Sequence, residues 1–215
     1  MLRRELKELI STGESSTVEF KRKFTSPVKI AKEIAAFANT HGGYLILGVD
    51  DDRTIIGVTS EKEQIELVTT AAEHYLDPPV YCDVEIINFD WREVIVIHVP
   101  ASDHKPHVII NDPDADPKEK RAYIRHNDES VLASKEMLRL MSGLNVHTAP
   151  MTLHIGDREK RLFAYLEEQG KITVNEFADL VNISRRRASQ ILVRLVRAQV
   201  LQMLTDRQTE YFALV

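Results

Sequence analysis

The apolar residues near the N-terminus change period twice, and each change predicts a new element. Residues 17–21 alternate between polar and apolar side chains, which is typical of a half-buried strand. Residues 28–38 then carry apolar side chains at helical spacing, and Pro27 suits the first turn of a helix. Residues 44–49 are almost continuously apolar, which predicts a strand covered on both faces. We expect a strand, a helix and a buried strand here, followed by a return strand at 54–58.

The same reasoning places the other elements of the N-terminal part of the chain. Apolar residues at helical spacing after a capping residue indicate helices, and runs rich in β-branched side chains indicate strands. The elements expected on these grounds are helices at 2–10, 61–76 and 134–141 and strands at 81–89, 93–99, 107–110 and 122–125. Such a mixture predicts an α+β fold, with a mixed α/β domain at the N-terminus.

The segment 157–215 shows a different order of elements. Asp157, Thr173 and Ser184 are suitable N-caps for three successive helices, and residues 201–214 are expected to form a hairpin. Three helices followed by a terminal hairpin are typical of a winged helix-turn-helix domain. The stretch before this segment lacks clear periodicity. The expected organisation is an N-terminal domain at 1–142, a linker at 143–156 and a small winged-helix domain at 157–215.

Charge is divided unevenly between these two parts. The whole chain has a net charge of −5, but residues 157–215 hold ten Lys and Arg against eight Asp and Glu. The C-terminal part is therefore at +2 and the rest of the chain at −7, so a surface for nucleic acid is expected at the C-terminal end. The single cysteine, Cys82, excludes an internal disulfide, and no apolar run reaches membrane-spanning length. We expect a cytoplasmic protein that has no membrane partner.

The third C-terminal helix, at 185–198, carries the strongest indication of DNA binding. A recognition helix contacts base edges with its N-terminal residues, and arginine with guanine or glutamine with adenine are favoured pairs. The candidate base-contacting residues are Arg185, Arg186, Arg187, Ser189 and Gln190, and the candidates for phosphate contact are Arg194 and Arg207. The alternative is a winged helix that contacts another protein, with the arginines forming a solvated face.

Acidic residues flank the two N-terminal strands. Glu14 and Glu19 lie before and within the first strand, and Asp50–Asp52 follow the second. Carboxylates that lie close together need a divalent metal, a neighbouring cation such as Lys21, or a raised pKa. The alternative is that Asp50–Asp52 form a solvated turn and that Glu19 and Lys21 are partners across strands. The spacing of these residues leaves both interpretations open.

Four short motifs together resemble a known family. They are Glu14–Lys21 (ESSTVEFK), Ala36–Gly43 (AFANTHGG), Gly48–Asp51 (GVDD) and Tyr123–Ser130 (YIRHNDES). The combination, which extends over about residues 14–134, resembles the Schlafen-type AlbA domain, a family usually described as DNA-binding proteins or transcriptional regulators. Asn127 stands where the family pattern has glycine. Asparagine tolerates the left-handed conformation better than most residues, so we expect the turn to be preserved.

The resemblance also implies a possible enzymatic activity. In the animal Schlafen relatives that cut transfer RNA, three acidic residues form a metal-dependent nuclease site. The matching residues here are Glu14, Glu19 and Asp51, with Asp50 as the neighbouring alternative and Lys21 as the basic companion. A divalent ion such as Mg²⁺ or Mn²⁺ held by these carboxylates would polarise a phosphoryl oxygen and activate water.

Two functions therefore follow from the sequence. The first is a transcriptional regulator that binds duplex DNA through its winged helix and needs no cofactor for that binding. The second is a metal-dependent endoribonuclease that acts on structured RNA. Helix-turn-helix proteins commonly dimerise to match two half-sites, so we expect a homodimer. Nucleotide binding has little support, because the sequence lacks GxxxxGK[ST] and Gly42–Gly43 precedes a strand rather than a helix.

Overall fold

The computed structural model describes residues 1–113, 116, 120–143, 153–206 and 209–215. The chain forms two compact units, Met1–Ser134 and Lys135–Val215. Helix α4, Lys135–Gly143, groups with the second unit, whereas the sequence led us to place most of it in the first. Of the expected linker at 143–156, residues 144–152 lie outside the described residues.

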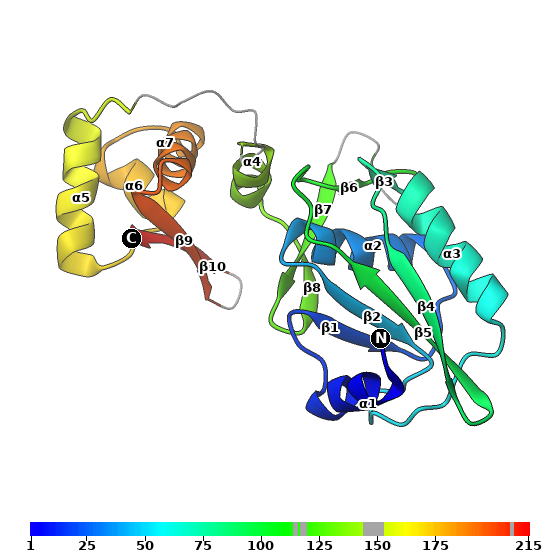
Figure 1. The fold of residues 1–215 in the computed structure, drawn as a ribbon. Coiled ribbons are helices and arrows are strands. Elements are labelled where there is room, and N and C mark those ends of the chain that lie inside the picture. The colour runs from blue at the N-terminus through cyan, green and yellow to red at the C-terminus, as the bar shows by residue number, and fades with distance from the viewer. Residues whose placement is uncertain (114–115, 117–119, 144–152, 207–208) are drawn as a thin grey trace. The chain divides into compact units, whose positions relative to one another are not determined.

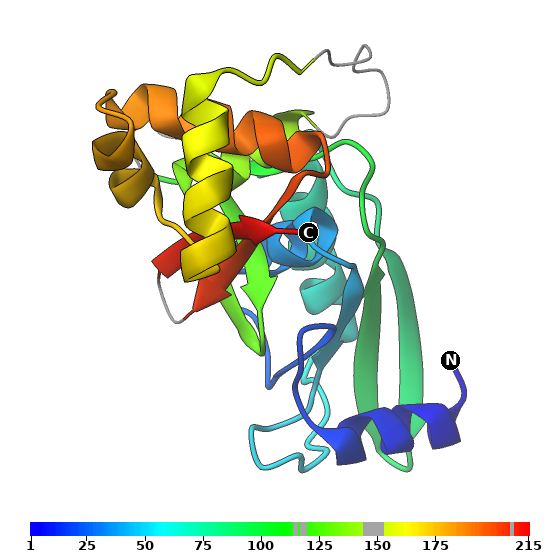
Figure 2. The ribbon, with the colours of Figure 1, turned by 90° about the vertical axis from the view of Figure 1, so that its left-hand side faces the viewer.

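A four-stranded sheet organises the first unit, with the order β1-β2-β5-β4 (Figure 1). Its strands are β1 (Val18–Lys21), β2 (Gly43–Leu47), β4 (Asp83–Phe89) and β5 (Arg92–Val99). Strands β1 and β2 are parallel, because helix α2 (Pro27–Asn39) carries the chain back between them. The other pairs are antiparallel, and β4 and β5 form a long hairpin that is visible as two green strands in Figure 2.

Both faces of this sheet are covered. Leu45 and Leu47 point into the core shared with α2 and with α3 (Glu61–His74), whereas Ile46 points into the core shared with α1 (Arg3–Thr12). The continuous apolar run of β2 is thus explained by its position between two cores, as expected. The buried side chains of the α1 side are Leu6, Ile10, Val18, Phe20, Ile46, Val49, Ile87, Val94 and Val96.

A second sheet, in the order β3-β6-β7-β8, completes the first unit. Its strands are β3 (Leu76–Asp77), β6 (Val108–Ile109), β7 (Arg121–His126) and β8 (Glu129–Leu132). Strand β8 was not predicted from the sequence. Its side chains are exposed or half-buried and show no clear alternation. Asn127 turns the chain between them with φ 55°, so the left-handed turn expected there is confirmed.

The prediction of a return strand at 54–58 is wrong. Only an isolated bridge joins Val49 to Ile55 in this part of the chain. Gly48 and Gly57 both have positive φ, and a Cβ placed on Gly48 would lie 2.9 Å from the Cα of Gly57. The close approach of two irregular backbone segments replaces the regular ladder that a strand would form.

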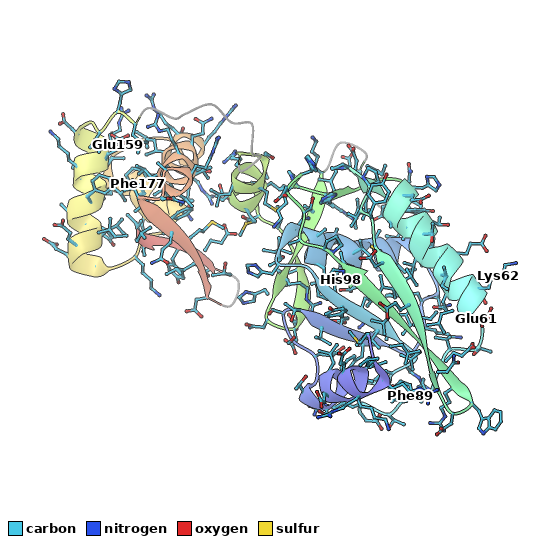
Figure 3. All side chains as sticks on the ribbon, in the orientation of Figure 1. Glu61, Lys62, Phe89, His98, Glu159 and Phe177 are labelled. Atoms are coloured by element: carbon cyan, nitrogen blue, oxygen red, sulfur yellow. The ribbon has the colours of Figure 1, made fainter. Side chains whose placement is uncertain are left out.

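The second unit contains helices α4, α5 (Asp157–Gln169), α6 (Val174–Leu180) and α7 (Arg185–Arg197), followed by the hairpin of β9 (Leu201–Asp206) and β10 (Thr209–Leu214). The side chains of Thr173 and Ser184 cap α6 and α7, as expected. The N-cap expected at Asp157 is wrong, because Asp157 is the first residue of α5 and Gly156 is its N-cap. Phe177 is fully buried in the core of this unit (Figure 3). Helices α5, α6 and α7 with the terminal hairpin have the element order of a winged helix.

The end of α2 depends on a glycine that allows close backbone contact. Gly42 has φ 72° and donates its N–H to the carbonyl of Phe37, which closes the helix. A Cβ at this position would lie 2.6 Å from the nitrogen of Ala101 and 2.7 Å from the carbonyl oxygen of Val99. We expect Gly42→Ala to lower the free energy of unfolding by about 1–3 kcal/mol through steric overlap, added to the strain of the positive φ.

Urea denaturation of the two variants Gly42→Ala and Gly170→Ala separates these effects. Gly170 also has a positive φ, 78°, but no atom lies within 4 Å of a Cβ placed there. Gly170→Ala should therefore show the cost of backbone strain alone, about 1–2 kcal/mol. Equal losses of stability in the two variants would contradict the packing that we describe around Gly42.

Candidate nucleic-acid interface

Helix α7 presents its arginines because its other side is anchored in the core. Ser184 Oγ accepts the N–H of Arg187 at 3.3 Å, which fixes the start of the helix. The residues buried in the core of the unit are Ala188, Ile191, Leu192 and Leu195. With this side fixed, the helical period leaves Arg185, Arg186, Arg187 and Gln190 exposed, as the sequence predicted.

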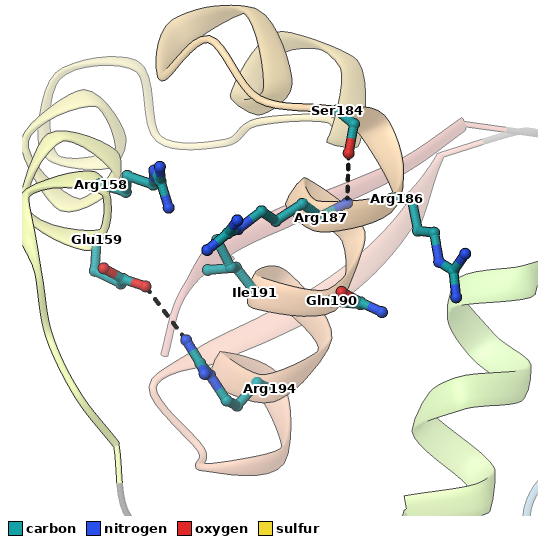
Figure 4. Close-up of a pocket in the computed structure, with 8 residues that line it drawn as sticks. All are labelled: Arg158, Glu159, Ser184, Arg186, Arg187, Gln190, Ile191 and Arg194. Atoms are coloured by element: carbon teal, nitrogen blue, oxygen red, sulfur yellow. Dashed lines mark hydrogen bonds and ion pairs between the residues drawn. The ribbon is translucent and has the colours of Figure 1, made fainter.

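An open hollow of about 420 Å³ lies between α5 and α7. Its lining comprises Arg158, Glu159, Ser184, Arg186, Arg187, Gln190, Ile191 and Arg194. In Figure 4, Arg187 extends from α7 toward Arg158 on α5, so that cations from two helices face the same space. Four arginines against one glutamate make this hollow strongly basic. It can accept an anion such as a phosphate group.

Glu159 holds one of these arginines in place. It is buried, accepts the N–H of Gly156 at 3.0 Å, and pairs with Arg194 at 3.3 Å (Figure 4). Arg194 is therefore directed along α5, and the charge of Glu159 is balanced within the unit. The sequence analysis did not identify Arg158, because a single exposed arginine in the first turn of a helix carries no indication of what it faces.

Two residues of the expected interface, Ser189 and Arg207, are not among the residues that line this hollow. Ser189 is only 1% exposed, and its Oγ accepts a hydrogen bond from Arg139 of α4. In this structure it is therefore not available to contact a base, which corrects its assignment to the exposed face. Arg207 lies outside the described residues.

The acidic residues of the first unit are arranged around a buried arginine. The side chain of Arg125 on β7 has no exposed surface, and its Nη1 lies 2.9 Å from Glu19 Oε2 and 3.5 Å from Glu33 Oε2. Its Nη2 donates to the carbonyl oxygens of Ser15 at 2.8 Å and Asp128 at 2.9 Å. The guanidinium also lies over the ring of Phe37, 4.7 Å from the centroid.

Glu19 is engaged through both of its carboxylate oxygens. One pairs with Arg125, and the other accepts a hydrogen bond from Lys21. Burial alone would lower the pKa of Lys21, but the hydrogen bond and the charge of Glu19 outweigh burial, and the pKa is raised. The expectation that Lys21 balances a nearby carboxylate is therefore consistent with this geometry, whereas Glu19 has no free oxygen atom directed at solvent.

The other two acidic residues of the expected nuclease site are placed differently. Glu14 Oε1 accepts the N–H of Phe20 at 2.9 Å, which satisfies a backbone donor on β1, the edge strand of the sheet. Asp51 is exposed in the turn after β2, next to Asp50, which pairs with Arg22 at 3.6 Å. No group of three His, Cys, Asp or Glu side chains suited to a metal ion occurs among the described residues. The charges of Glu14 and Glu19 both act on Lys21, so these two carboxylates have a neighbouring cation in common.

Known proteins support the fold of the first unit and its family. Residues 14–134, more than half of the chain, match the family model described as Schlafen, AlbA_2. Among solved structures, the DIP2311 protein from Corynebacterium diphtheriae matches with a TM-score of 0.51 and 19% identity, over 99% of this chain and 39% of that one. This chain thus spans about two fifths of that protein.

A second solved structure gives a weaker match. The N-terminal domain of a RecG-related protein from Nitrosomonas europaea has a TM-score of 0.43 and 22% identity, over 61% of this chain and 94% of that domain. At such identities the likeness of DIP2311 concerns the fold alone.

None of the helices in the described parts of the chain is both long and apolar enough to cross a membrane.

The Arg125 cluster predicts a large stability effect from a single substitution. Arg125→Gln leaves Glu19 and Glu33 buried without their shared cation, so we expect the free energy of unfolding to fall by about 3–5 kcal/mol. Urea denaturation followed by far-UV circular dichroism measures this loss. Asp51→Asn, which changes a single charge on an exposed turn, is the matched control and should stay within about 0.5 kcal/mol of the wild type. A loss for Arg125→Gln as small as that of the control would show that the cluster is not structural.

Proposed function

Because this chain belongs to the Schlafen AlbA_2 family, we propose that it is a nucleic-acid-binding protein that regulates transcription by binding duplex DNA through its C-terminal unit. DNA binding is the property most commonly attributed to members of this family. In this chain Glu19 of the N-terminal unit is paired with the buried Arg125, whereas four arginines line one open hollow of the C-terminal unit. The proposal therefore assigns DNA contact to the winged helix.

The observation that carries this proposal is the basic hollow between α5 and α7. Arg158, Arg187 and Arg194 come from two helices and converge on one open space. A guanidinium presents several donors in a fixed plane and is suited to phosphate oxygens. If the arginines of α7 formed only a solvated face, there would be no reason for an arginine of α5 to face the same space. The arrangement matches the phosphate-positioning contacts that hold a winged helix on DNA.

Residues at the start of α7 then face the bases. Arg186 and Gln190 are one turn apart on the exposed side of the helix, which is the part of a recognition helix that enters the major groove. Arginine pairs with guanine and glutamine with adenine through two hydrogen bonds each. We assign Arg185 to a position beside this base contact. Ser189 is not among the proposed base-contacting residues, because it is buried.

The proposal includes an assembly and a location. A homodimer would place two copies of α7 on two half-sites, and this DNA binding requires no cofactor. The single cysteine, Cys82, is half-buried, and burial raises the pKa of its thiol to about 12. A single cysteine leaves no pair for an internal disulfide, which fits a reducing compartment such as the cytoplasm. The alternative function is metal-dependent cleavage of structured RNA through Glu14, Glu19 and Asp51, with Lys21 as a cation beside Glu14 and Glu19.

Neutralising two arginines of the hollow should weaken DNA binding in a way that depends on salt. We expect Arg186→Gln/Arg187→Gln to weaken the affinity for duplex DNA at least about tenfold at low salt, because each phosphate or base contact contributes roughly 1–3 kcal/mol. If both contacts are to phosphates, the slope of log K against log [salt] should fall by about 2. Fluorescence anisotropy with a labelled duplex, repeated across salt concentrations, measures both quantities.

The control variant is Lys160→Gln/Arg161→Gln, which removes the same charge from exposed positions of α5 that do not line the hollow. It should change the affinity by much less than the α7 variant. Equal effects of the two variants would mean that only net charge matters. A parallel incubation of labelled RNA with Mn²⁺ tests the enzymatic alternative, and cleavage that is lost in Glu19→Gln would overturn our assignment of Glu19 to a structural role.

A further inference from the structure

One side of α7 is buried although it faces away from the core of the unit. Ser189 and Val193 are 1% and 6% exposed, yet neither belongs to the core that contains Ala188, Ile191 and Leu192. With 3.6 residues per turn, Val193 lies nearly opposite the middle of that core side. An apolar residue at this position of a recognition helix would face DNA or solvent if nothing covered it.

Helix α4 covers this side of α7. The two helices pack against each other within the second unit, as Figure 1 shows. Arg139 of α4 donates a hydrogen bond to Ser189 Oγ. One turn further, a Cβ placed on Gly143 would lie 2.4 Å from the guanidinium of Arg197, so the two helices approach closely there. Leu140 shares the face of Arg139 and Gly143 by helical spacing and is 6% exposed.

The same helix also limits the surface at the start of α7. A hollow of about 600 Å³ is bounded by α4 on one side and by the beginnings of α6 and α7 and the strand β10 on the other. Its lining comprises Lys135, Glu136, Arg139, Thr173, Val174, Asn175, Arg185, Arg186, Ser189, Thr209 and Glu210. In winged helices the start of the recognition helix, the preceding helix and the hairpin are the parts that approach DNA. Helix α4 therefore stands on the DNA-facing side of the unit.

The dimensions of the major groove make this position incompatible with full insertion of α7. The groove is about 12 Å wide, and one helix with its side chains is about 10–12 Å across. The groove thus admits α7 alone but not α7 with α4 packed along its outer side.

We propose that α4 and duplex DNA are alternative occupants of the outer face of α7, so that α4 keeps the C-terminal unit in a state of low DNA affinity until it is displaced. This inference rests on the proposed function. The ligand that α4 excludes from this face is duplex DNA. The face that α4 covers includes Val193 and lies next to the exposed Arg185 and Arg186, which can contact bases or phosphates. The apparent affinity is then the intrinsic affinity reduced by the fraction of molecules with α7 uncovered.

A variant that releases α4 tests the inference. Arg139→Ala/Leu140→Ala removes the hydrogen bond to Ser189 and a buried apolar side chain from the α4 face. If about nine molecules in ten have α4 in place, the affinity for duplex DNA should rise about tenfold. Ser142→Ala is the matched control on the same helix, because Ser142 is exposed and bonds only within α4, to the carbonyl oxygen of Leu138 at 2.8 Å. The control should bind as the wild type does.

Hydrogen exchange on the unmodified chain gives an independent measurement. On saturation with duplex DNA, the amides of α4 should exchange faster, while those of α5 and α6 keep their protection. If the release variant binds no tighter and α4 stays protected in the complex, DNA binds with α4 in place and the inference is overturned, although the proposed function stands. If the wild type, the control and the release variant all fail to bind duplex DNA, the proposed function and the inference fail together.

Discussion

The fold of the first unit depends on the burial of one guanidinium. Arg125 on β7 contacts Glu19 on β1 and Glu33 on α2, and it donates to the carbonyl oxygens of Ser15 and Asp128. A buried cation without partners is strongly unfavourable, so each of these contacts offsets part of the free-energy cost of burying the guanidinium. The result is that one side chain fixes the main sheet, the central helix and the β7–β8 hairpin relative to one another.

The same constraint accounts for the partners of the acidic residues near β1. Glu19 is divided between Arg125 and Lys21, and Glu14 satisfies the backbone of an edge strand. Arginines in the second unit have the opposite environment, since Arg186 and Arg187 are exposed and lie beside further cations. The same residue type is structural where it is buried and paired, and available for binding where it is solvated and clustered.

Periodicity predicted the elements with large buried faces, and it failed where contacts join distant parts of the chain. Strand β2 was located from its apolar residues, and helices α2 and α7 from helical spacing or start signals such as Pro27 and Ser184. Strand β8 was missed because its side chains are half-exposed, and the pairing of Arg125 with Glu19 joins residues 106 positions apart. Arg158 was missed for the same reason, since only the packing of α5 against the unit brings it to the hollow.

The two arginine-dependent features are joined by a very short connection. Ala133 donates its N–H to Ala122 at 2.8 Å just after β8, and α4 begins two residues later at Lys135. The N-terminal end of α4 is therefore tied covalently to the hairpin that Arg125 holds, while its face is packed on α7 through Arg139. Helix α4 thus follows the β7–β8 hairpin directly in sequence and packs on α7 within the second unit.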